Sequence, residues 1–548
     1  MKPTIPPAAQ LSIWTRPALF LIALGALGLF LGQPNLFLHF PPAIVIPGIC
    51  LFLLAFTAER LKALFWQGWL LGTLGYCGAI YWIAVPVNEI GGLPMPLAIP
   101  CVFFLSAYLG LFVGITALCF KWLQQVFGLS PLTGGAPQAG FFKVVACAVF
   151  SGLCVGGVEL FLMNKLFTGF PWPTMAAGLV AWPAWAQGAH LVGAYGLAAF
   201  FSFAAILGLC AFLVSGRVRF LAAILSLGLF AAAPLYGTWR LNTVPQPSSP
   251  ALTFGIVQGN IDQAQKWSPE FQRHTIATYF ALSDALVEKA RTQGHALSML
   301  IWPETAMPFP YEVEDLYASA LRHFAAKHGT PIGFGTVAHA RGTPGNKIFN
   351  RFQTISALGR TTGHYDKQHL VPFGEFAPFT IPIEFIENML QGMAFVPGKT
   401  TSPLPLASPE SGILFGVLIC YEAIYPEIAQ KQVGQGANLF INISNDAWFG
   451  PTSAPEQHLA LTALRAIEQQ RPIVRSTNSG HSASIDAYGR IAFATSLYTE
   501  DASLASLHPE EDNTPFHTAF AAIQLLLALG LAFSVLCGVY LWRVPKRS

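Results

Sequence analysis

The chain has 548 residues, of which 53% are hydrophobic and only 10% are charged. Ordinary soluble proteins carry roughly 25% charged residues, so this composition excludes a single soluble globular domain, and it excludes intrinsic disorder as well. The formal net charge of +3 is small and spread along the chain, which excludes a nucleic-acid-binding protein. We therefore expect much of the chain to lie in lipid.

The charged residues are unevenly distributed. The first 240 residues hold only three of the 27 acidic side chains and ten of the 30 basic ones. This difference predicts a membrane domain over residues 1–240 and a globular domain over residues 250–510. A last apolar stretch with a basic tail, residues 517–548, predicts a return to the membrane.

Eight apolar runs approach the length of about 20 residues that a helix needs to cross a bilayer. They cover residues 17–32, 41–57, 65–85, 98–120, 142–163, 190–214, 219–237 and 517–542. The first run has Lys2 and Arg16 before it, as a signal peptide would, but no small-residue cleavage site closes it and seven more runs follow. We therefore predict eight transmembrane helices.

Basic residues occur at every second connection between these runs, near residues 2–16, 60–62, 121–143, 217–219 and 543–547. Because basic connections stay on the cytoplasmic side, we expect both termini in the cytoplasm and residues 240–515 outside it. The aromatic connection over residues 167–173 would lie on the outer side. It is either an interfacial aromatic belt or a lipid-handling surface beneath the globular domain.

The globular domain alternates short apolar runs with helical stretches. Strands are expected over residues 252–258, 297–302, 332–337, 352–358, 413–419 and 439–443, with helices over residues 270–292 and 456–470. This alternation predicts one layered α/β domain.

Three reactive side chains follow strands of this domain, where the chemistry of α/β sheets collects. Glu304 follows the run 298–302, Cys420 follows the run 413–419, and Lys367 follows the strand around Ile355 by a turn. A carboxylate can act as a base, an ammonium can stabilise an oxyanion, and a thiol can attack a carbonyl. Taken singly, residues of these types are more often solvated or part of a core. Their joint occurrence, in a domain whose one thiol is Cys420, favours a catalytic site.

Other catalytic motifs fail on spacing. Gly398-Lys399-Thr400 resembles the end of a phosphate loop, but Met393 stands where a glycine is required. The sequence has no G-x-S-x-G, H-E-x-x-H or C-x-x-C motif. His364 and His369 flank Asp366 on an expected turn, which makes a weak metal site and favours surface residues. We expect neither a metal nor a cofactor.

Three blocks resemble the signatures of the nitrilase (carbon-nitrogen hydrolase) superfamily. They are Trp302-Pro303-Glu304, Tyr365-Asp366-Lys367 with residues 369–375, and Ile419-Cys420-Tyr421-Glu422. Combined with eight membrane segments, they resemble the apolipoprotein N-acyltransferase family in particular. The supporting blocks are residues 257–260, 266–267, 445–449 and 471–480, so the resemblance covers nearly the whole chain.

The resemblance implies a polytopic α-helical membrane protein that carries an αββα sandwich. It assigns the general base to Glu304, the oxyanion stabiliser to Lys367 and the nucleophile to Cys420. It also implicates four residues around the site: Trp267, Glu375, Tyr421 and Glu422. The alternative for the two aromatic residues is plain packing, and for the two acidic ones a surface position or an ion pair.

The implied reaction has two steps. A phospholipid would acylate Cys420, and the acyl chain would then pass to the N-terminal α-amino group of a diacylglyceryl-cysteine apolipoprotein. This places the protein in the bacterial inner membrane with its catalytic domain in the periplasm. Two alternatives stay open: a membrane-tethered amidase acting on a small soluble substrate, and a non-catalytic lipid-binding protein. The apolar segment 376–396 is interpreted as either a packed element or a mobile lid.

Overall fold

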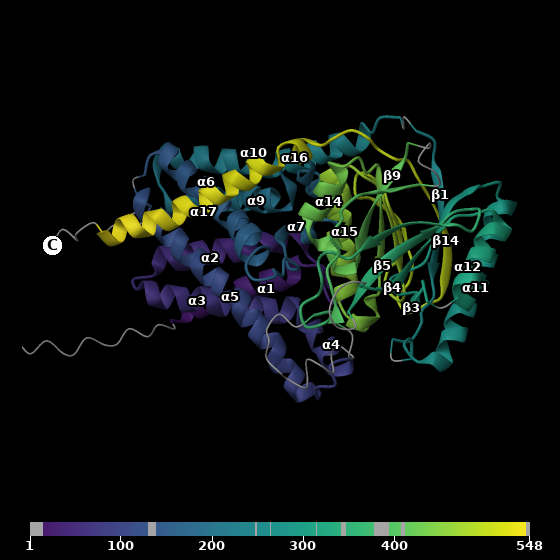
Figure 1. Ribbon diagram of the computed structural model, residues 1–548. Helices are drawn as coiled ribbons and strands as arrows, with labels where there is room; N and C mark the ends of the chain where they lie inside the picture. The colour runs from purple at the N-terminus through teal and green to yellow at the C-terminus, as the bar shows by residue number, and fades with distance from the viewer. Residues whose placement is uncertain are drawn as a thin grey trace, which may run out of the picture.

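The computed structural model describes residues 15–543, apart from residues 130–136, 138, 247–248, 264, 314, 341–346, 377–393 and 407–411. The molecule has a helical half and a half built on two β-sheets (Figure 1). The helices of the first half are α1 (Arg16–Gly32), η1 (Pro41–Val45), α2 (Ile46–Thr57), α3 (Leu61–Ala79), η2 (Tyr81–Ile83), α4 (Ala84–Glu89), α5 (Met95–Val126), α6 (Phe141–Gly157), η3 (Val158–Met163), α7 (Met175–Leu179), α8 (Pro183–Ala186), α9 (Ala189–Leu213), α10 (Gly216–Asn242) and α17 (Phe520–Arg543).

These helices identify an integral membrane protein, although the count of eight spans is not confirmed. Within the described residues, five helices are long and apolar enough to cross a membrane: α5, α6 with η3, α9, α10 and α17. The segments Leu61–Ala79 and Tyr81–Glu89 form a sixth only if they are taken as one span, because they are bent by 62°. The first two expected spans are shorter apolar helices, Arg16–Gly32 and Pro41–Thr57.

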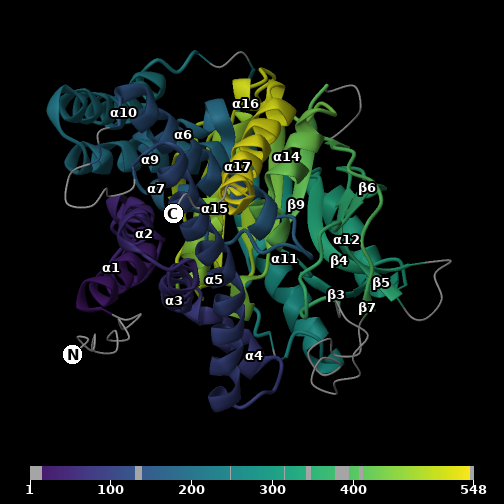
Figure 2. The same ribbon diagram turned by 90° about the vertical axis from the view of Figure 1, so that its left-hand side faces the viewer.

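Small residues let the membrane helices pack closely. Gly68 and Gly72 on α3 face Gly110 and Gly114 on α5, and a Cβ added at Gly72 would lie 3.0 Å from the Cα of Gly110. Close backbone approach through glycines four residues apart is a common way for helices to associate in lipid. The membrane helices lie in front of the sheets in Figure 2.

The other half contains two sheets packed face to face. The first has the order β14-β1-β2-β4-β5-β6, with β3 beside β4 and β7 beside β5; the second has the order β13-β12-β11-β10-β9-β8. Their strands are β1 (Leu252–Gln258), β2 (Leu297–Ile301), β3 (Met307–Pro310), β4 (Ile332–His339), β5 (Lys347–Ile355), β6 (Thr361–Asp366), β7 (Ala394–Phe395), β8 (Leu404–Pro405), β9 (Leu414–Ile419), β10 (Leu439–Ser444), β11 (Ile473–Thr477), β12 (Ala483–Ile485), β13 (Ile491–Ala494) and β14 (Asp501–Leu507).

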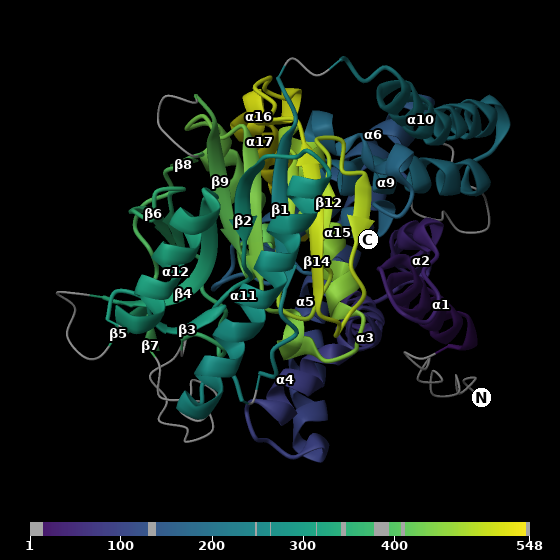
Figure 3. The ribbon, with the colours of Figure 1, turned by 90° about the vertical axis from the view of Figure 1, so that its right-hand side faces the viewer.

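Helices cover both outer faces, so the layers are α, β, β and α. The elements are α11 (Pro269–Thr292) and α12 (Asp315–His328) on the first sheet, and η5 (Cys420–Ile424), α14 (Pro426–Val433), η6 (Asp446–Phe449), α15 (Ala454–Gln469) and α16 (Pro515–Thr518) in the second half of the domain. Figure 3 shows α11 and α12 in front of the strands. Apolar side chains of both sheets, such as Ile256 and Val417, fill the core between them.

The second sheet is joined to the membrane helices by a shared core. Residues of α15, such as Leu461 and Leu464, belong to the same buried apolar cluster as Leu109 on α5 and Phe201 on α9. Accordingly, α14 and α15 lie between the sheets and the membrane helices (Figure 1). The half with the two sheets therefore packs directly on the membrane half.

Candidate active site

The three expected reactive residues lie at the carboxyl ends of strands. Glu304 follows β2, and Cys420 follows β9 in the other sheet. The expectation for Lys367 was incomplete: strand β5 ends at Ile355, and a further strand, β6, leads directly to the lysine. Strand β6 pairs antiparallel with β5, which places Asp366 opposite Arg351.

Lys367 is completely surrounded by protein and has two carboxylate partners. Its Nζ lies 2.9 Å from Oε2 of Glu375 and 3.5 Å from Oε1 of Glu304. Burial alone would lower the pKa of Lys367, but the charges of Glu375 and Glu304 outweigh burial and raise it. The lysine is therefore a fixed positive charge at the site.

The carboxylate of Glu304 accepts a hydrogen bond through only one of its two oxygens among the described residues. The side chain of Asn350 donates to Oε1 of Glu304 at 2.7 Å and to Oε1 of Glu375 at 2.9 Å, so one amide holds both carboxylates near the same lysine. The other oxygen of Glu304, Oε2, is buried and has no hydrogen-bond partner among the described residues. A buried acceptor without a partner costs stability, and a chemical role, such as receiving a proton, is one reason for a native protein to keep it.

Cys420 begins η5 with a φ of 50°, a left-handed conformation that is rare outside glycine. Two contacts hold this sharp turn: the N–H of Ile419 donates to Oε2 of Glu422 at 2.8 Å, and Nε2 of His458 donates to the carbonyl of Cys420 at 3.0 Å. Burial and the charge of Glu304 raise the pKa of the thiol, while Lys367 opposes them. The resting thiol is thus protonated, and it needs a base to become a nucleophile.

Glu422 connects the turn at Cys420 to the loop after Lys367. Its Oε1 accepts from the N–H of Gln368 at 2.7 Å and from the hydroxyl of Tyr365 at 3.0 Å. Its Oε2 accepts from Ile419, on the other sheet. Burial raises the pKa of Glu422 to about 7, although these donors favour its charged form.

Comparison with known proteins gives the family. Residues 254–511 match the family model of carbon-nitrogen hydrolases, and residues 25–207 match that of the apolipoprotein N-acyltransferase N-terminal domain. An apolipoprotein N-acyltransferase of Geobacter metallireducens is 32% identical over 460 residues, which cover 82% of each chain. This chain belongs to the apolipoprotein N-acyltransferase family.

A second relative agrees. An apolipoprotein N-acyltransferase of Caulobacter vibrioides is 33% identical over 504 residues, 88% of this chain and 87% of the relative. Among solved structures, a carbon-nitrogen hydrolase of Helicobacter pylori G27 covers 51% of this chain and 93% of its own, at 15% identity and a TM-score of 0.36.

The accessory residues that the family resemblance implicated lie near Glu304, Lys367 and Cys420. Glu375 and Glu422 are both buried, so a surface position for either is wrong. Tyr421 donates to the carbonyl of Gly169 at 3.3 Å and stacks on Trp172, so the aromatic connection 167–173 packs in part on the catalytic half. Trp267 is half-buried and follows Lys266, whose Nζ donates to the carbonyl of Glu304 at 3.1 Å.

The two histidines considered for a metal differ in environment. His364 is half-exposed, whereas the ring of His369 packs against that of Tyr425, with centroids 3.8 Å apart. Burial lowers the pKa of His369 to about 4. His369 is therefore not the surface residue that its expected turn suggested. In the described part of the chain, no group of three His, Cys, Asp or Glu side chains could hold a metal ion. Most of the suggested lid, residues 377–393, lies outside the described residues.

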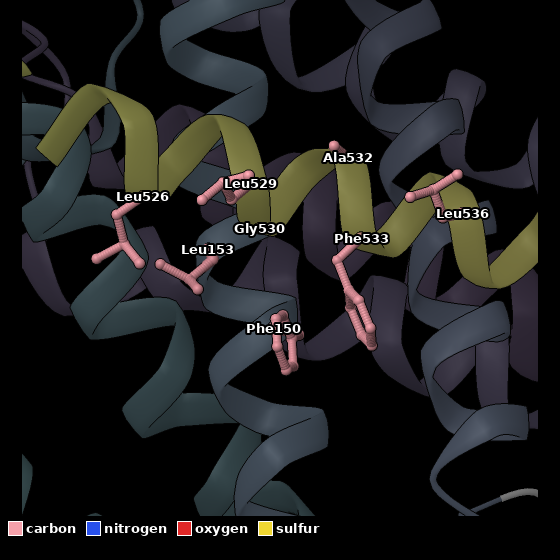
Figure 4. Close-up of a pocket in the computed structure, with 8 residues that line it drawn as sticks. All are labelled: Phe150, Leu153, Leu526, Leu529, Gly530, Ala532, Phe533 and Leu536. Atoms are coloured by element: carbon pink, nitrogen blue, oxygen red, sulfur yellow. The ribbon is translucent and has the colours of Figure 1, made fainter. Parts of the chain in front are cut away.

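A groove on the outside of the helical half, between α6 and α17, is a poor candidate for chemistry. It is lined by Phe150, Leu153, Leu526, Leu529, Gly530, Ala532, Phe533 and Leu536 (Figure 4). None of these side chains can ionise or attack a carbonyl. The reactive groups of the described chain gather instead at the ends of β2, β6 and β9.

Sequence reasoning missed three residues of the site. Asn350 lies inside strand β5, and Gln457 and His458 lie on α15, which was predicted as a helix without any role for these two residues. Asp446 was noted only as part of a block; it contacts Nδ1 of His458 at 3.1 Å and Arg475 at 2.8 Å. The one sequence signal for this group was the density of polar residues in a strand-and-helix region that is otherwise apolar.

Proposed function

We propose that this protein transfers an acyl chain from a membrane phospholipid to the N-terminal α-amino group of diacylglyceryl-cysteine in apolipoproteins. The observation that carries the proposal is the joint placement of Glu304, Lys367 and Cys420 beside a membrane domain of this family. Glu304 and Lys367 both act electrostatically on the Cys420 thiol.

The first half-reaction begins with a proton transfer. Glu304 accepts the thiol proton through Oε2, which has no hydrogen-bond partner in the described part of the chain, and Sγ of Cys420 attacks the ester carbonyl of the phospholipid. Lys367 and the main-chain N–H beside Cys420 stabilise the oxyanion, a contribution of about 3 kcal/mol per donor in comparable sites. The C–O bond then breaks, Glu304 returns the proton to the leaving alkoxide, and a lysophospholipid departs. Cys420 is left as a thioester.

The second half-reaction reuses the same groups. The α-amino group of the apolipoprotein attacks the thioester carbonyl, and Glu304 accepts the proton that the amine loses. The C–S bond breaks, the sulfur recovers a proton, and the acyl chain ends as an amide. One base and one cation therefore serve both steps, which favours a ping-pong mechanism.

The membrane domain brings the site close to its lipid substrates. Both are lipids, and a site packed on membrane helices meets them at a fixed height, which lowers the entropy cost of encounter. We propose residues 1–240 and 517–548 as the membrane domain, residues 250–510 as the periplasmic catalytic domain, and both termini in the cytoplasm of the bacterial inner membrane. The alternation of basic connections supports this orientation.

The test is transfer of a labelled acyl chain from phospholipid vesicles to a diacylglyceryl-cysteine peptide, with the N-acetylated peptide as the matched control. The proposal predicts label in the free-amine peptide alone. Label in neither peptide, together with release of ammonia from small amides, would favour the membrane-tethered amidase. That alternative is weakened by relatives named acyltransferases that cover most of the chain.

A further inference from the structure

Helix α15 is buried on all sides. Every one of its residues except Glu456 is buried, including the polar ones, because the helix lies between the second sheet and the membrane helices. The helix also lies behind the membrane helices in Figure 2. Its polar side chains therefore have protein partners on both sides, and two consecutive residues face opposite halves of the molecule.

Both polar atoms of the Gln457 side chain form hydrogen bonds with the membrane half. Its Oε1 accepts from the indole N–H of Trp82 at 3.0 Å and from that of Trp172 at 2.8 Å. Its Nε2 donates to the carbonyls of Pro34 at 3.0 Å and Ala79 at 2.9 Å. One amide thus joins the end of α1, the bend after α3 and the aromatic connection before α7.

His458, the next residue, binds the nucleophile's main chain. A carbonyl oxygen can only accept, so Nε2 of His458 carries the proton in its 3.0 Å contact with Cys420. Its Nδ1 lies 3.1 Å from Nη2 of Arg475, which can donate to it, and also 3.1 Å from Oδ1 of Asp446, which can only accept. Burial and the charge of Arg475 lower the pKa of His458, and they outweigh Asp446, which raises it. The lowered pKa favours the neutral ring, with its proton on Nε2.

We propose that Gln457 and His458 are positioning residues through which the membrane domain sets the conformation of Cys420. The inference rests on the proposed function, because it takes Cys420 as the nucleophile. Cys420 has a strained φ of 50°, and such a conformation persists only where the surroundings hold it. His458 supplies one of those contacts, and Gln457 fixes α15, and so His458, against the membrane helices.

The consequence is specific. A change in the membrane half that removes a contact to Gln457 shifts the thiol, and small misplacements of a reacting group lower rates by up to about 10²-fold. The effect falls on the acylation rate constant, not on substrate affinity, because Trp82, Gln457 and His458 are buried and act through the main chain of Cys420. It is therefore the same for a phospholipid and for a short soluble ester.

The first experiment uses a matched pair of tryptophans in the membrane half. Trp82→Phe removes the N–H that reaches Gln457, and Trp69→Phe removes an N–H that reaches only the carbonyl of Ala107 on α5. Single-turnover acylation of the full-length protein, followed by intact mass, gives both a rate constant and an amplitude. We expect Trp82→Phe to lower the rate constant about tenfold at full amplitude, with both donors, and Trp69→Phe to leave it unchanged.

The amplitude separates positioning from folding. A purely structural role would leave fewer active molecules that still react at the wild-type rate, so a reduced amplitude with a normal rate constant overturns the inference. Equal rate constants for Trp82→Phe, Trp69→Phe and the wild type overturn it as well. A wild-type protein that forms no thioester contradicts the proposed function itself, which is a different outcome.

A second pair of variants tests His458. Gln places an amide N–H near the position of ring Nε2, whereas Asn places it near Nδ1. We therefore expect His458→Gln to retain most of the acylation rate constant, and His458→Asn to lose about tenfold. Equal rates for these two variants contradict the role of the Nε2 contact, and so does a slower His458→Gln.

Discussion

Lys367 lies closer to Glu375 than to Glu304: its Nζ is 2.9 Å from the first carboxylate and 3.5 Å from the second. The lysine's charge is therefore balanced mainly by Glu375, and Glu304 contacts the lysine less closely. One buried cation thus lies beside two buried carboxylates, at a short distance from one and a longer distance from the other. This arrangement also separates the base of the proposed mechanism from the residue that holds the lysine.

The triad assignment predicts distinct losses. Cys420→Ala should abolish both half-reactions, because no thioester can form. Glu304→Gln and Lys367→Met should leave a folded protein with severely reduced acylation, since they lack the base and the oxyanion partner. Cys77→Ala, which removes a thiol of the membrane half, is the control and should react normally. Normal thioester yield in Glu304→Gln or Lys367→Met would refute the assignment.

The pH dependence of Cys420 alkylation should move in opposite directions in two variants. The charge of Glu304 raises the thiol pKa and that of Lys367 lowers it. Glu304→Gln should therefore lower the pKa, so that iodoacetamide reacts at lower pH, whereas Lys367→Met should raise it. Peptide mapping at Cys420 measures the rate at each pH. Shifts in the same direction would show that the two charges do not both act on the thiol.

Asn350 should matter although it contacts no substrate in the proposed mechanism. Asn350→Leu removes the donor that both carboxylates share, and hydrogen bonds to charged groups contribute about 1.5–3 kcal/mol each. We expect a loss of roughly 2 kcal/mol in the free energy of unfolding and a large fall in acylation rate. Gln353→Leu, on the same strand, loses its bond to the Gly363 carbonyl and should cost stability alone. A wild-type acylation rate in Asn350→Leu would contradict this role.

The sequence predicted the strands that precede Glu304 and Cys420 because each is a mostly apolar run. It did not predict β6, whose residues Thr361–Asp366 are mostly polar and lie at the edge of a sheet, where no apolar pattern is needed. Hydropathy located the apolar segments of the membrane half, but it cannot show the bend after Ala79.

The roles of Gln457 and His458 were invisible for a related reason. Polar residues on a helix normally face water, and only the packing of the membrane half on α15 buries them. That packing joins residues more than 370 positions apart, such as Trp82 and Gln457. Local pattern therefore predicts which elements form, whereas contacts between the two halves need the structure.

The proposed orientation predicts where a reporter works. An enzyme that is active only in the periplasm should be active when fused near Ser506 and inactive when fused after Ser548. Cellular activity of the two fusions, at matched expression, is the measurement. The reverse pattern would place the catalytic half in the cytoplasm, away from the substrates we propose.

The central claim is that Cys420 carries the acyl chain between the two substrates. Intact mass spectrometry of the purified protein, exposed to phospholipid without an acceptor, measures this directly. The account predicts one added acyl group on Cys420, which disappears when a diacylglyceryl-cysteine peptide is added. An unmodified Cys420 in a preparation that still transfers acyl chains to the peptide would contradict it.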